Sequence, residues 1–595
     1  MSFIRIKGIC IENYRSFGEK KNIIFPSEEY RKPVAIVGYN NAGKTNLLNA
    51  ILIGVTEKYM SKDKLSLNDF HNRDFQNKPY IFSGLKSSRE EKANGRPTSL
   101  TGYHFLKVDL DGSEIENVKI ESYSDYKRTK LIYGTYGAAK YYKIFYINFH
   151  EIKKEISTKK TSWGNLTSFL AKHIKNLVDS DKSMLEKKAL FKDEIAAATG
   201  NVMHETALHQ FIEKIQNNYS KNLRDNECKI EFSLPDYEDI FLEMMFKVGL
   251  NGDSDNLIPV EHFGDGYISM FVMAVIQAIA ETNNDDRCLF LFEEPESFLH
   301  ENHQEYFYKT VLCGLAENGH QVIYTTHSDK MIDIFDTKGL IRLEFDETKK
   351  QTEVTYNNVK DDFSPGHTND EETIDKIKDF NNYIKIIEPN LNKIIFSKKV
   401  ILVEGPNDLL VYNEVIRKKV LELTGDNKYA ETYLNFKNIS IIPHHGKPTA
   451  QILIKLCKHL GIEYFVINDF DFNENVVSEL NYATEEAFKA SKFYLNKIPF
   501  LSSCNAKGEE RNQSTKKAMM TVNWRLLNSS SQDNIHFNIP KLEKVIGYDS
   551  DDKDSIGIWK VINKMESISE ELVPENLWDF LEIRPSEVLD LVYKS

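Results

Sequence analysis

Acidic side chains follow two apolar segments in the last third of the chain. Glu404 and Asp408 follow one segment, and Asp469 and Asp471 follow the other. Carboxylates that converge repel one another and lose hydration, so a hard divalent cation is the simplest reason to gather them. Two Mg²⁺ or Mn²⁺ ions can activate a water and stabilise the leaving oxygen in phosphodiester cleavage. We therefore predict that these four residues are metal ligands and catalytic residues of a phosphodiesterase.

A second chemical pattern lies near the start of the chain. Gly38 to Thr45 reads G-x-x-x-x-G-K-T. Gly38 and Gly43 allow the loop to turn its N–H groups toward phosphate oxygens. Lys44 can reach the β- and γ-phosphates, and the Thr45 hydroxyl can bind Mg²⁺. The pattern predicts an ATP site.

Both patterns require particular secondary structure. The apolar residues 34–37 predict a strand before the glycine loop, and a helix is expected after it. Residues 399–403 and 463–468 read as buried parallel strands whose ends carry Glu404 and Asp469. Ends of parallel strands lie at one edge of a sheet, which would gather the acids. The alternative is an ordinary α/β domain with acidic loops.

Composition bounds the remaining possibilities. A chain of 595 residues predicts three to five domains or subdomains. The net charge of -13 excludes a polycation, so nucleic acid would bind through local patches. The six cysteines form no C-x-x-C pair, and no signal peptide or membrane-length apolar run is visible. We expect a cytoplasmic protein with reduced thiols and no zinc site.

Residues 11–17, IENYRSF, precede a loop of the form G-x-N-x-x-G-K-T-N. This combination resembles the opening of SMC-like and RecF-like ATPases of the ABC class. The resemblance implies that Asn41 and Asn46 join the nucleotide site. It also implies that further ATPase segments follow in a fixed order.

Those segments are present in the expected order. Gly264 and Gly266 begin an apolar helix, as the signature segment of ABC-type ATPases does, although Gly-Asp-Gly replaces the usual Ser-Gly-Gly. Glu293 and Glu294 end a buried strand, which implies an Mg²⁺ ligand and the residue that activates water. His327 ends the next strand and would contact the γ-phosphate. Such ATPases complete their sites in dimers, so the resemblance implies a homodimer or larger homo-oligomer.

The acidic segment resembles a Toprim domain, and an ABC-class head followed by Toprim is the layout of the OLD family of nucleases, which includes Gabija-type and some retron-type phage defence nucleases. In that family a later acid and a lysine complete the site, which implies Glu543 and Lys553 here, with Lys560 as the fallback. Phe470 inside D-x-D departs from the family pattern. The resemblance implies an ATP-regulated, Mg²⁺- or Mn²⁺-dependent DNA endonuclease in anti-phage defence. Its partner would be DNA, with a helicase or a reverse-transcriptase complex as a possible second protein.

The predicted fold class is α/β, an ABC-type ATPase head with a helical insertion followed by a Rossmann-like Toprim domain. The insertion is either a dimerisation arm or a plain helical subdomain. Residues 69–71 could be a sensor loop or an ordinary solvated loop. The expected segments are the two halves of the head at 1–150 and 226–350, the helical insertion at 151–225, a linker and bracing helix at 351–395, and the Toprim domain at 396–595 with a basic insert at 489–525.

Other functions remain open at this point. The chain could be an SMC-like ATP-dependent DNA clamp or scaffold without nuclease activity. The basic insert carries interleaved aromatic residues, which fits either a nucleic-acid surface or a solvated helical insert. A topoisomerase would need a tyrosine nucleophile on a separate DNA-gate domain, and we find none.

Overall fold

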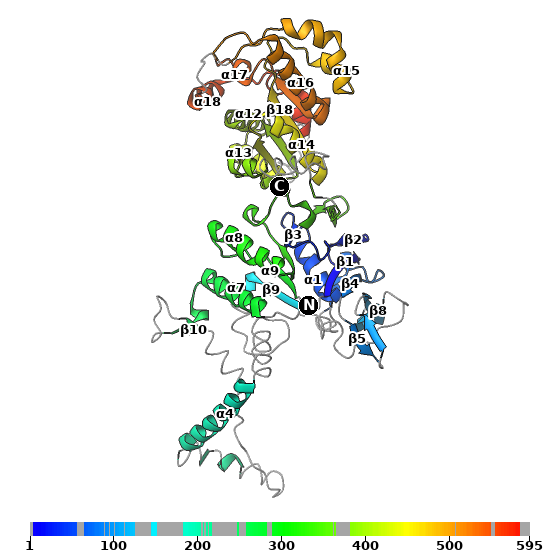
Figure 1. The fold of residues 1–595 in the computed structure, drawn as a ribbon, viewed down its shortest axis with the longest axis vertical. Coiled ribbons are helices and arrows are strands. Elements are labelled where there is room, and N and C mark those ends of the chain that lie inside the picture. The colour runs from blue at the N-terminus through cyan, green and yellow to red at the C-terminus, as the bar shows by residue number, and fades with distance from the viewer. Residues whose placement is uncertain are drawn as a thin grey trace. The chain divides into compact units, whose positions relative to one another are not determined.

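A computed structural model describes most of the chain in two compact units, which we treat separately (Figure 1). The first unit comprises Met1–Asn22, Ser27–Val34 and Thr45–Thr326, and the second comprises Ile23–Pro26, Ala35–Lys44 and His327–Ser595. The described residues are 4–55, 65–87, 90–93, 96–99, 102–111, 114–124, 144–151, 182–203, 206, 210–211, 213–216, 247–248, 257–282, 288–360, 362–363, 381–505, 507–548 and 554–583.

The first unit combines an antiparallel sheet with three parallel strands. Strands β1 (Ile4–Glu12), β4 (Tyr80–Ser87), β7 (Gly102–Asp111) and β8 (Glu114–Ser124) pair antiparallel in that order. Strand β12 (Leu289–Glu293) lies between β9 (Ile144–Asn148) and β13 (Gln321–Thr325), and all three are parallel. Every residue of β12 and β13 is buried, as expected for strands covered on both faces.

Two helices of this unit, α1 (Lys44–Val55) and α7 (Asp265–Thr282), were predicted from the sequence. Helix α1 lies in the first unit except for its first residue, Lys44. Helices α7, α8 (Glu301–Phe307) and α9 (Cys313–Glu317) also belong to the first unit. Within the predicted insertion the structure describes the helix α4 (Lys182–Met203). Its role in dimerisation remains a prediction.

The second unit begins with the strands around the glycine loop. Strand β3 (Val34–Val37) pairs parallel with β14 (Leu340–Asp346), and β14 pairs antiparallel with β15 (Gln351–Tyr356). Residues 351–356 were expected to open a linker but form this strand. Part of the expected bracing helix is described, at residues 381–387.

A four-stranded parallel sheet follows, with the order β17–β16–β18–β19. The strands are β16 (Lys399–Val403), β17 (Ile439–Pro443), β18 (Glu463–Asp469) and β19 (Ile535–Asn538). Helices α12 (Pro406–Thr424) and α13 (Asn427–Lys437) flank one side, and α14 (Lys447–Leu460) and α16 (Gln513–Ser530) flank the other (Figure 1). Helices α15 (Glu485–Ala490), α17 (Leu542–Val545), α18 (Ser555–Lys564) and α19 (Glu575–Phe580) complete the domain.

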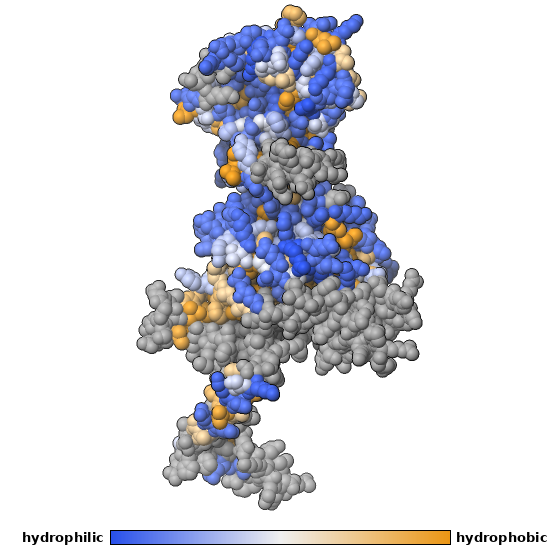
Figure 2. Space-filling view, viewed as in Figure 1, coloured by the Kyte–Doolittle hydropathy of each residue, from blue (hydrophilic) through white to orange (hydrophobic). Residues whose placement is uncertain are grey.

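Apolar packing makes this sheet a rigid support. Strand residues such as Ile401 and Phe465 pack with Val411 and Tyr412 of α12, all with no exposed surface. Interiors packed in this way hold strand ends in fixed positions. Among the residues coloured by hydropathy in Figure 2, most of those in view are hydrophilic, and the hydrophobic ones form separate areas. No helix among the described residues is long and apolar enough to cross a membrane.

Candidate active site

Four carboxylates meet at the C-terminal edge of the parallel sheet. Glu404 follows β16, and Asp408 lies one turn into α12, which starts at Pro406 after the N-cap Gly405. Asp469 is the last residue of β18. Glu543 lies in α17, just after β19. Strands β16, β18 and β19 are parallel, so the acids at their C-terminal ends lie at one edge of the sheet.

Backbone and amide donors orient the cluster. Glu404 Oε2 accepts hydrogen bonds from Asn468 Nδ2 at 3.1 Å and from the Asp469 N–H at 3.2 Å. Asp469 Oδ1 accepts from the Leu542 N–H at 2.8 Å. Asp408 Oδ2 accepts from the Gly405 N–H at 3.2 Å, which also caps α12. Each of these three acids therefore has one oxygen held by the protein.

Burial and the charges of neighbouring acids raise the pKa of two members of the cluster, Asp408 and Asp469. Burial, followed by the charges of Glu404 and Glu543, raises the pKa of Asp408 to about 7. Burial and the neighbouring charges of Glu404 and Asp408 also raise the pKa of Asp469 well above its usual value. Such mutual repulsion indicates a site built for a positive charge.

The donor set fits a divalent cation. Asp408 is 8% exposed, and its Oδ1 is buried without a hydrogen-bond partner. An unsatisfied buried carboxylate oxygen is costly unless a cation binds it. In the described part of the chain, no three His, Cys, Asp or Glu side chains are already spaced to enclose a metal ion. Binding would therefore require the carboxylates to draw together.

Asp471 has a different environment from the other four acids. Its backbone has a φ of 67°, and its Oδ2 lies 2.6 Å from Lys447 Nζ. Lys553 lies outside the described residues. The fallback, Lys560, is exposed on α18.

A buried histidine supports the cluster and was missed by sequence reasoning. His444 Nε2 lies 3.1 Å from Asn468 Oδ1, and its Nδ1 can accept from the Gly446 N–H at 3.1 Å. Burial lowers the pKa of His444 to about 4, so the ring is neutral near pH 7. With its proton on Nε2, the ring directs the Asn468 NH₂ group toward Glu404. Its position directly after a predicted strand is the sequence feature that could have identified His444 as part of the site.

The glycine loop has the predicted shape. Gly38 has a φ of 152°, and a Cβ there would lie 2.2 Å from the Leu343 carbonyl oxygen, so only glycine fits. Gly43 and Asn41 also have positive φ, at 96° and 67°. Lys44 Nζ donates to the carbonyl oxygens of Gly38 and Tyr39 at 3.0 and 2.9 Å. The lysine therefore lies folded over the loop that would hold phosphate.

Asn46 belongs to a polar network with the segment that precedes the loop. Its Nδ2 donates to Ser16 Oγ at 2.8 Å, and Arg15 Nη1 donates to its Oδ1 at 3.4 Å. Arg15 Nε donates to Asp69 at 2.7 Å, and His71 Nδ1 lies 2.8 Å from the Arg15 carbonyl oxygen. The loop at 69–71 is thus tied to this network, and a sensor role stays a prediction.

The paired glutamates end β12 as predicted. Glu293 is buried and accepts a hydrogen bond from the Tyr146 hydroxyl. Glu294 has a φ of 45°, and its Oε2 lies 2.6 Å from His150 Nε2. The Glu294 N–H donates to Thr325 Oγ1 at 3.1 Å. Tyr146 and His150 were not singled out from the sequence, because nothing in it links β9 to β12.

The remaining ATPase residues occupy the predicted local settings. Gly264 lies just before α7 and Gly266 in its first turn, where a Cβ would lie 3.0 Å from the Phe298 carbonyl oxygen. His327 is exposed, two residues after β13. Their contacts with nucleotide remain predictions.

The basic insert is less available to nucleic acid than its composition indicates. Phe493 and Trp524 are buried, and Trp524 stacks on Phe488 with ring centroids 5.7 Å apart. Phe500 is 79% exposed. Four of the eight basic residues are engaged in ion pairs with acids, namely Lys489 and Arg525 with Glu485, Lys497 with Glu479, and Lys516 with Glu510.

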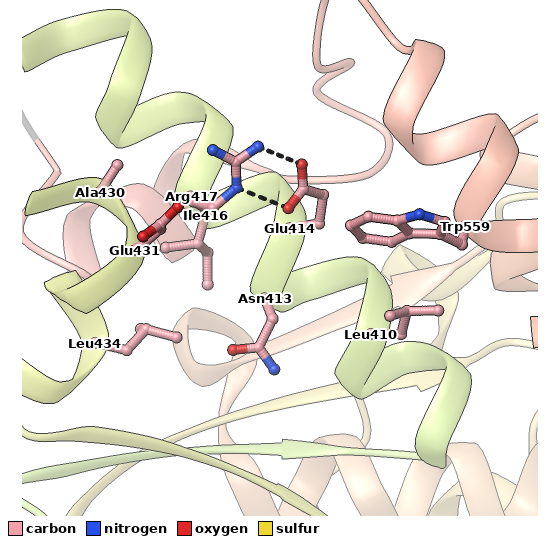
Figure 3. A pocket seen from close by; sticks show the side chains of 9 residues that line it. All are labelled: Leu410, Asn413, Glu414, Ile416, Arg417, Ala430, Glu431, Leu434 and Trp559. Carbon is pink, nitrogen blue, oxygen red and sulfur yellow. Dashed lines mark hydrogen bonds and ion pairs between the residues drawn. The ribbon is translucent and has the colours of Figure 1, made fainter. Parts of the chain in front are cut away.

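A pocket between α12 and α13 lies apart from the acids. It is lined by apolar residues such as Leu410, Leu434 and Trp559, and by the Glu414–Arg417 ion pair (Figure 3). Arg417 donates to both Glu414 oxygens, at 2.8 and 2.6 Å. None of the predicted catalytic residues lines it.

The raised pKa of Asp408 predicts that the stability of the folded chain depends on pH. This folded-state pKa lies above the usual 3.8, so ionisation between about pH 4 and pH 7 destabilises the metal-free folded chain. In EDTA, the free energy of unfolding should fall by about 2–4 kcal/mol more in wild type than in Asp408→Asn between pH 5 and pH 8. Denaturant titration at both pH values measures this. The control Glu422→Gln, on the exposed face of α12, should show the pH dependence of wild type. If Asp408→Asn also showed the pH dependence of wild type, the raised pKa of Asp408 would be contradicted.

Comparisons with known proteins agree with this organisation. The chain is 27% identical to "OLD nuclease" of Thermus scotoductus over 40% of this chain and 42% of that protein. It is 24% identical to "Old nuclease" of Escherichia phage P2, covering 80% of this chain and 78% of that protein. It is also 24% identical to "Endonuclease GajA" of Bacillus cereus, covering 69% of this chain and 68% of that protein.

Among solved structures, an SMC head bound to the C-terminal winged-helix domain of ScpA aligns at 15% identity, covering 59% of this chain and 96% of that one, with a TM-score of 0.32. Residues 395–471 match the family "Overcoming lysogenization defect protein-like, TOPRIM domain". Residues 5–332, more than half of the chain, match the family "AAA ATPase domain". The predicted ATPase head and Toprim domain are both confirmed, and the chain belongs to the AAA ATPase domain family, with an OLD-like Toprim domain after the head.

Proposed function

We propose that this protein is an ATP-regulated DNA endonuclease that depends on Mg²⁺ or Mn²⁺. The observation that carries the proposal is the buried, mutually repelling carboxylate cluster at the edge of the Toprim sheet, with Asp408 Oδ1 unsatisfied. The similarity to proteins named OLD nuclease and Endonuclease GajA supports phosphodiester cleavage. We propose a role in anti-phage defence because the sequence motifs resemble those of the OLD family, which includes phage defence nucleases.

In this proposal Glu404, Asp408, Asp469 and Glu543 hold a divalent cation. Such an ion supplies a nucleophilic water near neutral pH and neutralises charge on the phosphate. The protein's own contribution is to orient the ligands. Asn468 fixes one Glu404 oxygen, and the Leu542 N–H fixes one Asp469 oxygen, so their other oxygens are available to the ion.

The head would bind ATP through the loop from Gly38 to Thr45. Lys44, which now contacts the Gly38 and Tyr39 carbonyls, would move to the phosphates. Thr45 and Glu293 would hold Mg²⁺. Glu294 would activate the attacking water, with His150 holding its side chain in place.

Contacts within the second unit would give bound nucleotide a route to affect cleavage. Arg342 on β14 pairs in register with Val37 on β3, directly before the glycine loop. Its guanidinium donates to the carbonyls of Ile395 and Ser397 at 3.0 and 2.8 Å, just ahead of β16. Strand β16 leads to Glu404. A shift of the loop on ATP binding would therefore reach the strand that positions a nuclease ligand.

We also propose that the protein acts on DNA as a homodimer or larger homo-oligomer, together with a second defence protein. Exposed Tyr267 and Met270 of α7 and Phe298 would suit a head–head interface. Lys553 is retained as the proposed lysine of the nuclease site.

Glu404→Gln should abolish cleavage of supercoiled plasmid in Mg²⁺ or Mn²⁺. We expect a loss of about a hundredfold or more, because metal-ion catalysis contributes several kcal/mol. Gel analysis of nicked and linear products measures this. Glu422→Gln, an exposed change on α12, should cleave as wild type. If wild type and Glu404→Gln cut equally, the Toprim site is not the nuclease and the DNA-clamp alternative is favoured.

Lys44→Ala should remove any difference in cleavage between reactions with and without ATP. The lysine ammonium is the side chain expected to bind the β- and γ-phosphates. Initial cleavage rates across a range of ATP concentrations give the result. Lys349→Ala, an exposed change next to β15, should retain the ATP effect. An undiminished ATP response in Lys44→Ala would contradict regulation through the glycine loop.

A further inference from the structure

Lys447 lies at the same sheet edge as the acids. It is the first residue of α14, which begins shortly after β17 ends at Pro443. Its side chain is 10% exposed. Its Nζ donates to Asp471 Oδ2 at 2.6 Å and to Asn523 Oδ1 at 2.9 Å. Lysine is rarely buried without such partners.

The position is unfavourable for a lysine unless it is compensated. The N-terminus of a helix carries a partial positive charge, which repels an ammonium group. Burial adds a desolvation cost. Asp471 supplies the compensating charge, so the two side chains depend on each other.

Both partners of Lys447 are themselves held in place. Asn523 has no exposed surface, and its Nδ2 donates to the Phe470 carbonyl at 2.8 Å, which turns its Oδ1 toward the lysine. The Asp471 N–H donates to the Pro540 carbonyl at 2.8 Å. The Asp471 carbonyl accepts from Ser503 Oγ at 2.6 Å. The ion pair is therefore built into the domain and is not a chance surface contact.

The acids at this edge thus fall into two groups. Glu404, Asp408, Asp469 and Glu543 lie close enough for their charges to affect one another. Among the described residues, Glu404, Asp408 and Asp469 form no ion pair with a lysine or arginine. Asp471 is neutralised by Lys447. We propose that the Lys447 ammonium takes the place of a second divalent cation, so that the nuclease centre holds one tightly bound ion at the four-acid cluster. This inference rests on the proposed nuclease function.

The proposal gives Lys447 a part in the chemistry. Asp471 and Asn523 use two of the three N–H donors of the ammonium. The third is expected to meet an oxygen of the scissile phosphate, where a fixed positive charge stabilises the developing negative charge. Asp471 then positions this lysine and is not a metal ligand, in contrast to the expectation from its D-x-D spacing.

The stoichiometry of Mn²⁺ binding tests the proposal. Isothermal titration of the nucleotide-free full-length protein should give one tightly bound Mn²⁺ per chain in wild type and none in Glu404→Gln. Lys447→Met should gain a second ion, because Asp471 loses its counter-charge, whereas Lys447→Arg should retain one. Lys455→Met, an exposed change on α14, is the matched control and should also bind one.

Asp471→Asn is a second test, which remains valid if the Lys447→Met protein fails to fold. It should keep one Mn²⁺ with affinity within about twofold of wild type. Two tightly bound ions in wild type, with one lost in Asp471→Asn, would overturn the inference and leave the nuclease proposal intact. Absence of tight Mn²⁺ binding in wild type would contradict the metal centre itself, and the inference with it.

Discussion

Electrostatic repulsion among buried carboxylates is the constraint on which the Toprim site depends. Glu404, Asp408, Asp469 and Glu543 cannot all ionise at one sheet edge without a large cost, and the raised pKa of Asp408 reflects it. A well-packed hydrophobic core offsets this electrostatic free energy, because it holds β16, β18 and their flanking helices in place. The fold is thereby kept ready to gain free energy from a cation.

The same site uses several ways to manage charge. The four-acid cluster awaits a cation, Asp471 is matched by Lys447, and neutral His444 adds orientation through Asn468 without adding charge. Backbone N–H groups hold single carboxylate oxygens and leave others available. In the head, Lys44 donates hydrogen bonds to the Gly38 and Tyr39 carbonyl oxygens of the glycine loop. Each arrangement stabilises the protein while keeping chemically useful groups at the edge of a sheet.

Much of this organisation could be predicted from the sequence, because a strand followed by a turn and a helix has a local signature. Strands β3, β12 and β16 and the start of α1 were predicted because apolar runs and glycines determine them locally. Lys447, Asn523 and Asn468 could not be identified, since their contacts join segments 24 to 76 residues apart. Composition left two interpretations of the basic insert open, a nucleic-acid surface or a solvated insert. It could not show that Trp524 is a core residue or that Arg525 pairs with Glu485.

The central claim is that the four-acid cluster is a divalent-cation site. The most direct measurement is the anomalous difference density of Mn²⁺-soaked crystals of the full-length protein without nucleotide. We expect a strong peak within about 2.1–2.3 Å of oxygens from Glu404, Asp408 and Asp469, with Asp408 Oδ1 among them. A manganese ion bound elsewhere, with the cluster lacking a peak at saturating Mn²⁺, would contradict the account.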